Sequence, residues 1–102
     1  MKSKYITYFD IEKVVITPGA KELMIKENLT TSKLLLLLEK HKFNEDDNPN
    51  EEDKKANKLA TITGGMFLSA YKIGNEKVYI ISYIDPTEVK SLETTILLAT
   101  EY

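Results

Sequence analysis

The sequence predicts a single α+β domain, in which an antiparallel sheet carries helices packed on one face. Three observations predict it: a β-branched run near the start, helical spacing of apolar residues through the middle, and strand-like alternation over the last third. The chain has 102 residues, which is the length of one domain, so residues 1–102 are expected to share one core. The predicted order of elements is β-α-α-α-β-β-β, an arrangement typical of the α+β class.

The first strand is predicted at residues 14–16, a Val-Val-Ile run. Thr17 is expected to cap the helix that follows, with Pro18 at its first position, where a missing N–H costs nothing. Ala20 and Leu23 fall on its apolar face. Asn28 is expected to end this helix in a left-handed conformation.

A second helix is predicted through residue 33 to about 41–43, capped by one of residues 30–32. At helical spacing Leu34, Leu37, Leu38 and His41 share a face, whereas Leu36 lies on the opposite side. Leu36 therefore indicates either a second packing layer or a partner surface. A third helix is predicted over about 51–62, ended by Gly64 and Gly65.

The last third is predicted to form three strands. Residues 66–73 and 77–84 are joined by Gly-Asn-Glu, a tight hairpin signal. Residues 88–92 are expected to bulge or loop before a final strand at 94–99. Whether the first strand pairs at an edge or between the later strands stays open at this point.

Charge is distributed unevenly. The net charge is −2, and residues 44–53 hold six carboxylates and no lysine, which predicts a solvated acidic loop. All fourteen basic residues are lysine, so no guanidinium is present to hold a phosphate at two points. This balance argues against a dedicated nucleic-acid binder. An acidic inhibitor of a DNA-acting defence enzyme stays open as an alternative, provided that the loop is ordered within a continuous negative face.

Several classes of chemistry are excluded or disfavoured by composition. There are no cysteines and one histidine, so disulfides, thiolate metal sites and multi-histidine metal sites are excluded. We expect neither a metal nor another cofactor. The N-terminal residues lack the apolar segment of a secretory signal, and the longest apolar run, residues 34–38, is too short to cross a bilayer. We therefore expect a cytoplasmic protein without membrane contact.

Several short segments stand in a fixed order along the chain: VVITPGA at 14–20, His41, DKKAN at 53–57, the glycine pair at 64–65, LSAY at 68–71, VYII at 78–81, TTILL at 94–98 and the final Glu101-Tyr102. In these segments and their spacing the sequence resembles a family of small bacterial proteins called plasmid-related proteins. The resemblance implies a compact α+β domain that is often associated with mobile DNA, without an established activity. Where the family tends to have Gly-Asp-Trp-Gly this chain has residues 44–47, and Met66 and Pro86 stand where it tends to have arginine. Members are sometimes labelled as a type I restriction enzyme M subunit, but the glycine-rich cofactor loop of a methyltransferase is missing from this sequence.

The candidate binding residues are the polar side chains of these segments, and no residue is predicted to be catalytic. His41 is interpreted first as an architectural residue near a helix C-terminus, where it suits the helix dipole. The alternative is a small hydrolase or nucleic-acid-processing protein that uses His41 as a general base. In that case His41, Asn57 and Ser69 should converge at a pocket. The complete candidate set is His41, Asp53, Asn57, Ser69, Tyr71 and Asp85.

The leading hypothesis is a non-catalytic accessory or interaction protein from a prokaryote, associated with mobile genetic elements. Its expected partner is another protein or a second copy of the chain in a homodimer, because Leu36 and the strand edges need to be covered.

Overall fold

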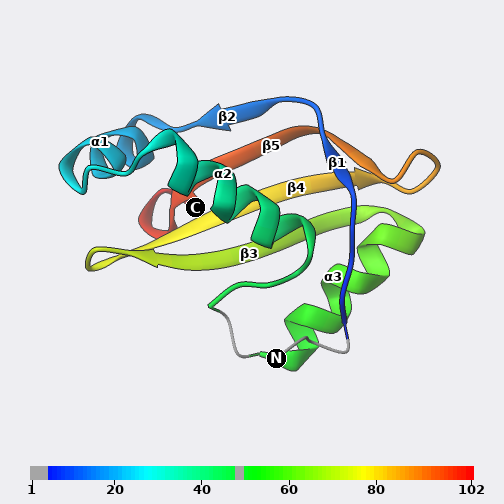
Figure 1. Ribbon diagram of the computed structural model, residues 1–102. Coiled ribbons are helices and arrows are strands. Elements are labelled where there is room, and N and C mark those ends of the chain that lie inside the picture. Colours follow the sequence, from blue (N-terminus) through cyan, green and yellow to red (C-terminus); the bar gives the residue numbers. More distant parts are fainter. Residues whose placement is uncertain (1–4, 48–49) are drawn as a thin grey trace.

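The computed structural model describes residues 5–47 and 50–102, and it confirms the α+β class and the predicted order of the main elements (Figure 1). Residues 1–4 and the centre of the acidic loop, 48–49, lie outside the described residues. The helices are α1 (Pro18–Lys26), α2 (Thr31–Lys42) and α3 (Glu51–Thr63), followed at the C-terminus by the short η1 (Ala99–Glu101). The strands are β1 (Asp10–Ile11), β2 (Val14–Ile16), β3 (Gly65–Ile73), β4 (Glu76–Asp85) and β5 (Lys90–Leu98).

Local capping signals begin and end the helices where the sequence predicts. The Thr17 hydroxyl accepts a hydrogen bond from Ala20 N, which satisfies one of the free amides in the first turn of α1. Asn28 has φ 53°, and the next amide, Leu29 N, reaches back to Met24 O at 2.8 Å. This is the 6→1 bond of a Schellman end. Thr30 caps α2 in the same way as Thr17 caps α1.

The sheet is mixed rather than wholly antiparallel. Strands β3, β4 and β5 form an antiparallel meander, as predicted, but β1 and β2 pair with β5 in parallel. Between β2 and β5 the chain forms three helices and the β3–β4 hairpin, and β5 then runs in the same direction as β2. The first strand therefore lies at an edge, beside β5, and β3 forms the opposite edge.

Two strand predictions need correction. The final strand begins at Lys90, not at residue 94, because a register shift between Ser82 and Ile84 lets β5 pair with the end of β4. Strand β1 was not predicted, since two residues carry no readable alternation. It exists because Asp10 and Ile11 lie opposite Lys90 and Ser91 of the lengthened β5.

The helices α1 and α2 cover one face of the sheet, and α3 runs along the β3 edge (Figure 1). The larger buried cluster joins these helices to the strands through Leu23, Leu38, Tyr71 and Ile80. A smaller cluster joins α3 to the sheet and to the N-terminal segment, and it contains Phe9, Ala60, Phe67 and Ile84. No helix in the described part of the chain is long and apolar enough to cross a membrane.

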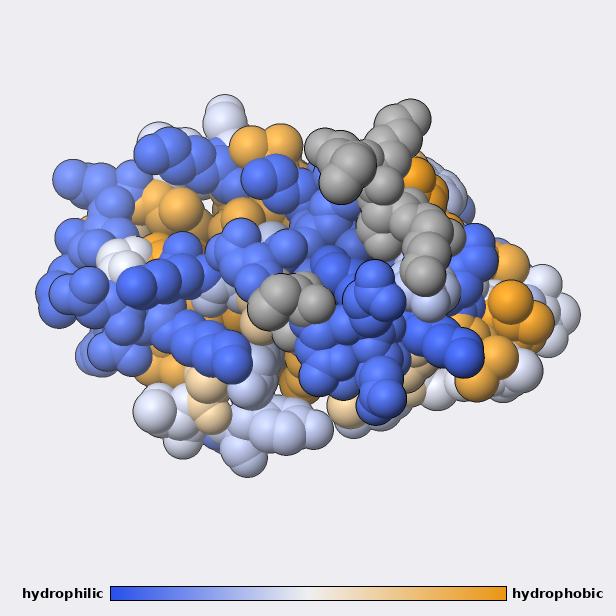
Figure 2. Space-filling model, turned by 90° about the horizontal axis from the view of Figure 1, so that it is seen from below, coloured by the Kyte–Doolittle hydropathy of each residue, from blue (hydrophilic) through white to orange (hydrophobic). Residues whose placement is uncertain are grey.

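The molecular surface seen from below is mostly hydrophilic, and hydrophobic residues show at the right-hand end and between the hydrophilic ones on the left (Figure 2). Across the described residues, twelve large hydrophobic side chains are exposed, among them Ile25 on α1, Leu36 on α2 and Ile62 on α3. The prediction that Leu36 faces away from the core therefore agrees with its exposed fraction of 55%.

Candidate functional site

His41 lies in the last turn of α2 and points into the protein interior, where its side chain is 0% exposed. The helical spacing that places Leu34 and Leu38 against the sheet carries His41 to the same side. The imidazole meets Phe9 and Phe67 nearly edge-on, with ring centroids 5.5 and 5.0 Å away. The histidine is thus enclosed by aromatic rings from two other segments.

Both ring nitrogens of His41 bind hydroxyl groups from the sheet. Nδ1 lies 2.6 Å from Ser69 Oγ on β3, and Nε2 lies 2.8 Å from Ser82 Oγ on β4. Ser82 continues to Thr94 Oγ1 on β5 at 2.6 Å. We call the connected set the His41 network. Its members are His41, Ser69, Ser82, Ser91 and Thr94, and each of them is 0% exposed.

The Ser91 end of the His41 network fixes the direction of its hydrogen bonds as far as His41 Nε2. Ser91 donates its proton to the Glu93 carbonyl at 2.8 Å, and Thr94 donates to Ser91 at 3.3 Å. Because a hydroxyl has one proton, Ser82 must donate to Thr94 and can only accept from His41. Nε2 therefore carries a proton, and in the neutral ring Nδ1 accepts the proton of Ser69.

Burial lowers the pKa of His41 from its usual 6.5 to about 3. The cause is desolvation, since removing the imidazolium from water is costly when no carboxylate faces it. A protonated ring would also turn Nδ1 into a donor and take from Ser69 its only acceptor in the His41 network. His41 is therefore neutral throughout the physiological range of pH.

A second polar cluster closes the outer edge of β3. The side chain of Asn57, on α3, donates to Leu68 O at 2.7 Å and accepts from Leu68 N at 3.0 Å. It also donates to Asn44 Oδ1 at 2.9 Å, and Asn44 in turn donates to Tyr5 O and Lys54 O. Asn57 thus replaces the backbone of a neighbouring strand and joins α3 to the loop after α2.

The first carboxylates of the acidic loop complete that edge. Asp46 accepts from Ala70 N at 2.7 Å and pairs with Lys54, while Asp47 accepts from Lys72 N at 3.1 Å. The Asp47 amide also donates to Ala70 O at 3.0 Å. These contacts occupy backbone groups that an edge strand would otherwise present to another chain.

The remaining candidate residues lie apart from His41. Tyr71 is buried and donates from its hydroxyl to Glu45 O at 2.9 Å, and burial raises its pKa. Asp53 is exposed in the first turn of α3, where its charge suits the helix dipole. Asp85 ends β4 and accepts from Thr87 N at 2.9 Å. Of the candidate set, His41 and Ser69 lie in hydrogen-bond contact with each other, and the Ser69 hydroxyl also interacts with the Tyr71 hydroxyl.

Sequence reasoning missed the importance of Ser82, Thr94 and Asn44. Ser82 falls on the helix-facing side of β4 by simple alternation with Val78 and Ile80, so a small polar residue among buried apolar ones was the available signal. The polar group that Ser82 meets comes from a helix 41 positions earlier in the chain, which alternation does not predict.

Chemically, the Ser69–His41 pair has the geometry of a hydroxyl beside a general base. However, both side chains are fully buried, and neither is among the residues that line the hollows beside β2 and α1, beside Asn57, or between α2 and the end of β3. No cluster of His, Asp and Glu able to hold a metal ion occurs among the described residues. Comparison of the chain with family models, with curated proteins and with solved structures finds no match.

Proposed function

We propose that this protein is a non-catalytic interaction protein, which acts through its surface while the His41 network holds its interior together. The observation that carries this proposal is that Ser69 and His41, a hydroxyl and an imidazole with catalytic geometry, are each 0% exposed. A nucleophile has to meet its substrate within about 3–3.5 Å, and this hydroxyl is sealed under packed rings and strands.

The hydrogen-bond inventory supports a structural role for the interior. Among the described residues, no buried side-chain nitrogen or oxygen lacks a hydrogen-bond partner. A reactive centre needs at least one polar group held ready for a substrate, whereas here Ser69, His41 and Ser82 satisfy one another. The network links α2 to three strands, which is a task of architecture.

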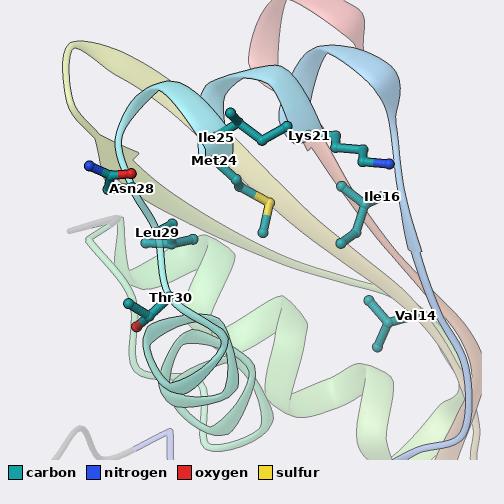
Figure 3. A pocket seen from close by; sticks show the side chains of 8 residues that line it. All are labelled: Val14, Ile16, Lys21, Met24, Ile25, Asn28, Leu29 and Thr30. Atoms are coloured by element: carbon teal, nitrogen blue, oxygen red, sulfur yellow. The ribbon is translucent and has the colours of Figure 1, made fainter.

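The surface supports the other half of the proposal. Ile25, Ile62 and Tyr83 are each at least 64% exposed and belong to different elements. Next to Ile25 there is also an apolar hollow of about 750 Å³, lined by β2, α1 and the turn between α1 and α2 (Figure 3). Apolar surface of this kind is typical of interaction sites.

A hydrolase that uses Ser69 with His41 is the second candidate, favoured by the 2.6 Å distance between Oγ and Nδ1. It requires that β3 or α2 open to admit a substrate. The acidic-inhibitor alternative has less support, because Asp46 and Asp47 bind the backbone of β3 instead of forming part of an open negative face.

Labelling with a fluorophosphonate reagent, which reacts with activated serines, tests the proposal. We expect no adduct on Ser69 by mass spectrometry at neutral pH, while the urea-unfolded chain serves as the control for intrinsic reactivity. A stoichiometric adduct on Ser69 in the folded protein, absent in Ser69→Ala, would establish the hydrolase candidate in place of this proposal.

The setting of this interaction role is part of the proposal. The resemblance to plasmid-related proteins supports a prokaryotic protein carried on mobile genetic elements and acting in the cytoplasm. Sequencing of the genes around its own gene tests this, and a position among plasmid or phage genes is the expected result. A consistent position among unrelated metabolic genes would contradict it.

A further inference from the structure

The two edges of the sheet are treated differently by the rest of the chain. At β3, the outer backbone groups of Leu68, Ala70 and Lys72 are occupied by Asn57, Asp46 and Asp47. At β2, the described residues supply neither a strand nor a side-chain hydrogen bond on the side away from β5. Natural sheets protect their edges against unwanted pairing. Because this chain protects the β3 edge and leaves the opposite β2 edge open, the open edge is suited to binding another strand.

The open groups of β2 belong to Val14 and Ile16. Thr94 N donates to Lys13 O at 2.8 Å, and Thr17 N donates to Ile96 O at 3.0 Å, which places residues 13, 15 and 17 in the ladder with β5. In a strand, alternate residues direct their N–H and C=O to opposite sides. The N–H and C=O of Val14 and Ile16 therefore point away from β5, toward the outside of the sheet.

An apolar hollow of about 750 Å³ lies directly beside this edge. Figure 3 shows the side chains of Val14 and Ile16 pointing into it from β2, with Met24 and Ile25 on α1 opposite them. Leu29 closes the end next to α2, and Ile25 is 69% exposed. A strand laid along β2 would thus send every second side chain into an apolar space.

The charge of the hollow distinguishes between two possible occupants, a second copy of this chain and a segment of another protein. Lys21 is the charged residue among the eight that line the hollow. A second copy pairing through its own residues 13–17, Lys-Val-Val-Ile-Thr, has no carboxylate in that segment to offer Lys21, and the preceding Glu12 is already paired with Lys90. A segment of another protein that carries an acidic side chain would satisfy it, so charge complementarity favours a partner peptide over a homodimer.

From these features we infer that the β2 edge binds an extended segment of a partner protein by strand addition, with alternate apolar side chains in the hollow and a carboxylate at Lys21. Backbone hydrogen bonds to Val14 and Ile16 provide affinity for any extended chain, and the hollow and Lys21 provide specificity. This inference rests on the proposed interaction function and names its surface and its class of partner.

The test uses a synthetic seven-residue peptide with valine or isoleucine at alternate positions, threonine between them, and glutamate at one end. We expect titration into the ¹⁵N-labelled protein to shift the amide signals of residues 14–16 and to slow hydrogen exchange at Val14 and Ile16. The same peptide N-methylated at the amides facing β2 should bind at least tenfold more weakly. The peptide is tested in two forms, with the glutamate at its first or at its last position. The inference would be overturned if neither form bound at millimolar concentration, or if the shifted amide signals mapped to another surface.

Matched variants separate the site from general effects. Ile25→Asp places a carboxylate at the rim and should weaken binding at least tenfold, whereas Ile62→Asp, on α3 and exposed to 64%, should leave it unchanged. Lys21→Glu should reverse the preference toward a peptide ending in lysine. Equal effects of the two isoleucine variants would contradict the inference.

Light scattering distinguishes the homodimer. We expect the free protein to keep its monomer mass as its concentration rises; a doubled mass that Ile25→Asp abolishes would replace the peptide with a second copy. If the peptide does not bind and Ser69 stays unlabelled by the fluorophosphonate, only this inference is refuted. An adduct on Ser69 would refute the proposed function itself.

Discussion

His41 donates from Nε2 to Ser82 Oγ across 2.8 Å, and neither side chain reaches solvent. This contact connects the last turn of α2 to the central strand β4, and through Ser82 the connection continues to Thr94 on β5. A buried imidazole in such a position must be neutral, so the stability of the fold is coupled to pH.

The first prediction concerns that coupling. The pKa of His41 is lowered to about 3 in the folded protein, so below pH 6.5 the unfolded chain binds a proton that the folded chain does not. The stability that depends on neutral His41 is therefore fully present above pH 6.5 and is lost as the pH falls toward 3. From pH 7 to pH 5 we expect the free energy of unfolding to fall by about 2 kcal/mol, measured by urea denaturation.

The control for this prediction is direct, since His41 is the chain's one histidine. Its ring signals in NMR should stay constant from pH 7 to pH 5 in the folded protein and titrate near 6.5 in urea. Titration of the folded-state signals above pH 6 would show that the ring is accessible and would contradict the prediction.

The second prediction concerns Ser82. Replacement by alanine leaves the His41 Nε2 proton without an acceptor and Thr94 Oγ1 without a donor, both in the buried interior. We expect Ser82→Ala to destabilise the protein by about 2 kcal/mol. Ser32→Ala, at an exposed position of α2, is the control and should change stability by less than about 0.5 kcal/mol. Equal effects of the two variants would mean that the His41 network contributes nothing to stability.

The sequence predicts those parts of the fold that depend on near neighbours. Thr17 and Pro18 mark the start of α1, and Asn28 marks its end, because capping involves residues three to five positions apart. The face of α2 that carries Leu38 and His41 is likewise predicted by helical spacing. Strand β1 was missed because Asp10 and Ile11 form a strand only through pairing with Lys90 and Ser91, 80 residues away.

The candidate site shows the same division. His41 and Ser69 could be named in advance as polar residues in apolar segments, but their contact depends on how α2 lies over β3. Asn57 could be named too, whereas its role could not: its partners are the backbone N–H and C=O of Leu68, which every residue has. The open edge at β2 becomes visible only once the sheet order is known.

The third prediction concerns the blocked edge. Asn57→Ala removes two hydrogen bonds to Leu68 and one to Asn44, so we expect a loss of about 2–3 kcal/mol in stability. The amide of Leu68 should exchange faster with solvent, and the variant should aggregate more readily, because a strand edge becomes available. Asn75→Ala, in the exposed hairpin turn, is the control. An unchanged exchange rate at Leu68 would show that another group protects this edge.

The fourth prediction concerns Glu101, which caps α1 from the far end of the chain. Its carboxylate accepts hydrogen bonds from the Thr17 hydroxyl at 2.7 Å and from Gly19 N at 3.2 Å, and its pKa is lowered chiefly by the bond from Thr17. A lowered carboxyl pKa means that this stabilisation is present above the ordinary pKa of a glutamate and is lost as the pH falls through the folded-state value.

Glu101→Gln should therefore speed hydrogen exchange at Gly19 and lower the melting temperature at pH 7, and the difference from the unmodified protein should shrink as the pH falls below 4. The physical reason is the partial positive charge at the start of α1, which a negatively charged carboxylate stabilises more strongly than a neutral amide oxygen does. Glu93→Gln, on the exposed side of β5 beside Lys13, removes the same charge away from a helix terminus and serves as the control. If the two variants behaved alike at Gly19, the C-terminus would not hold α1 in place.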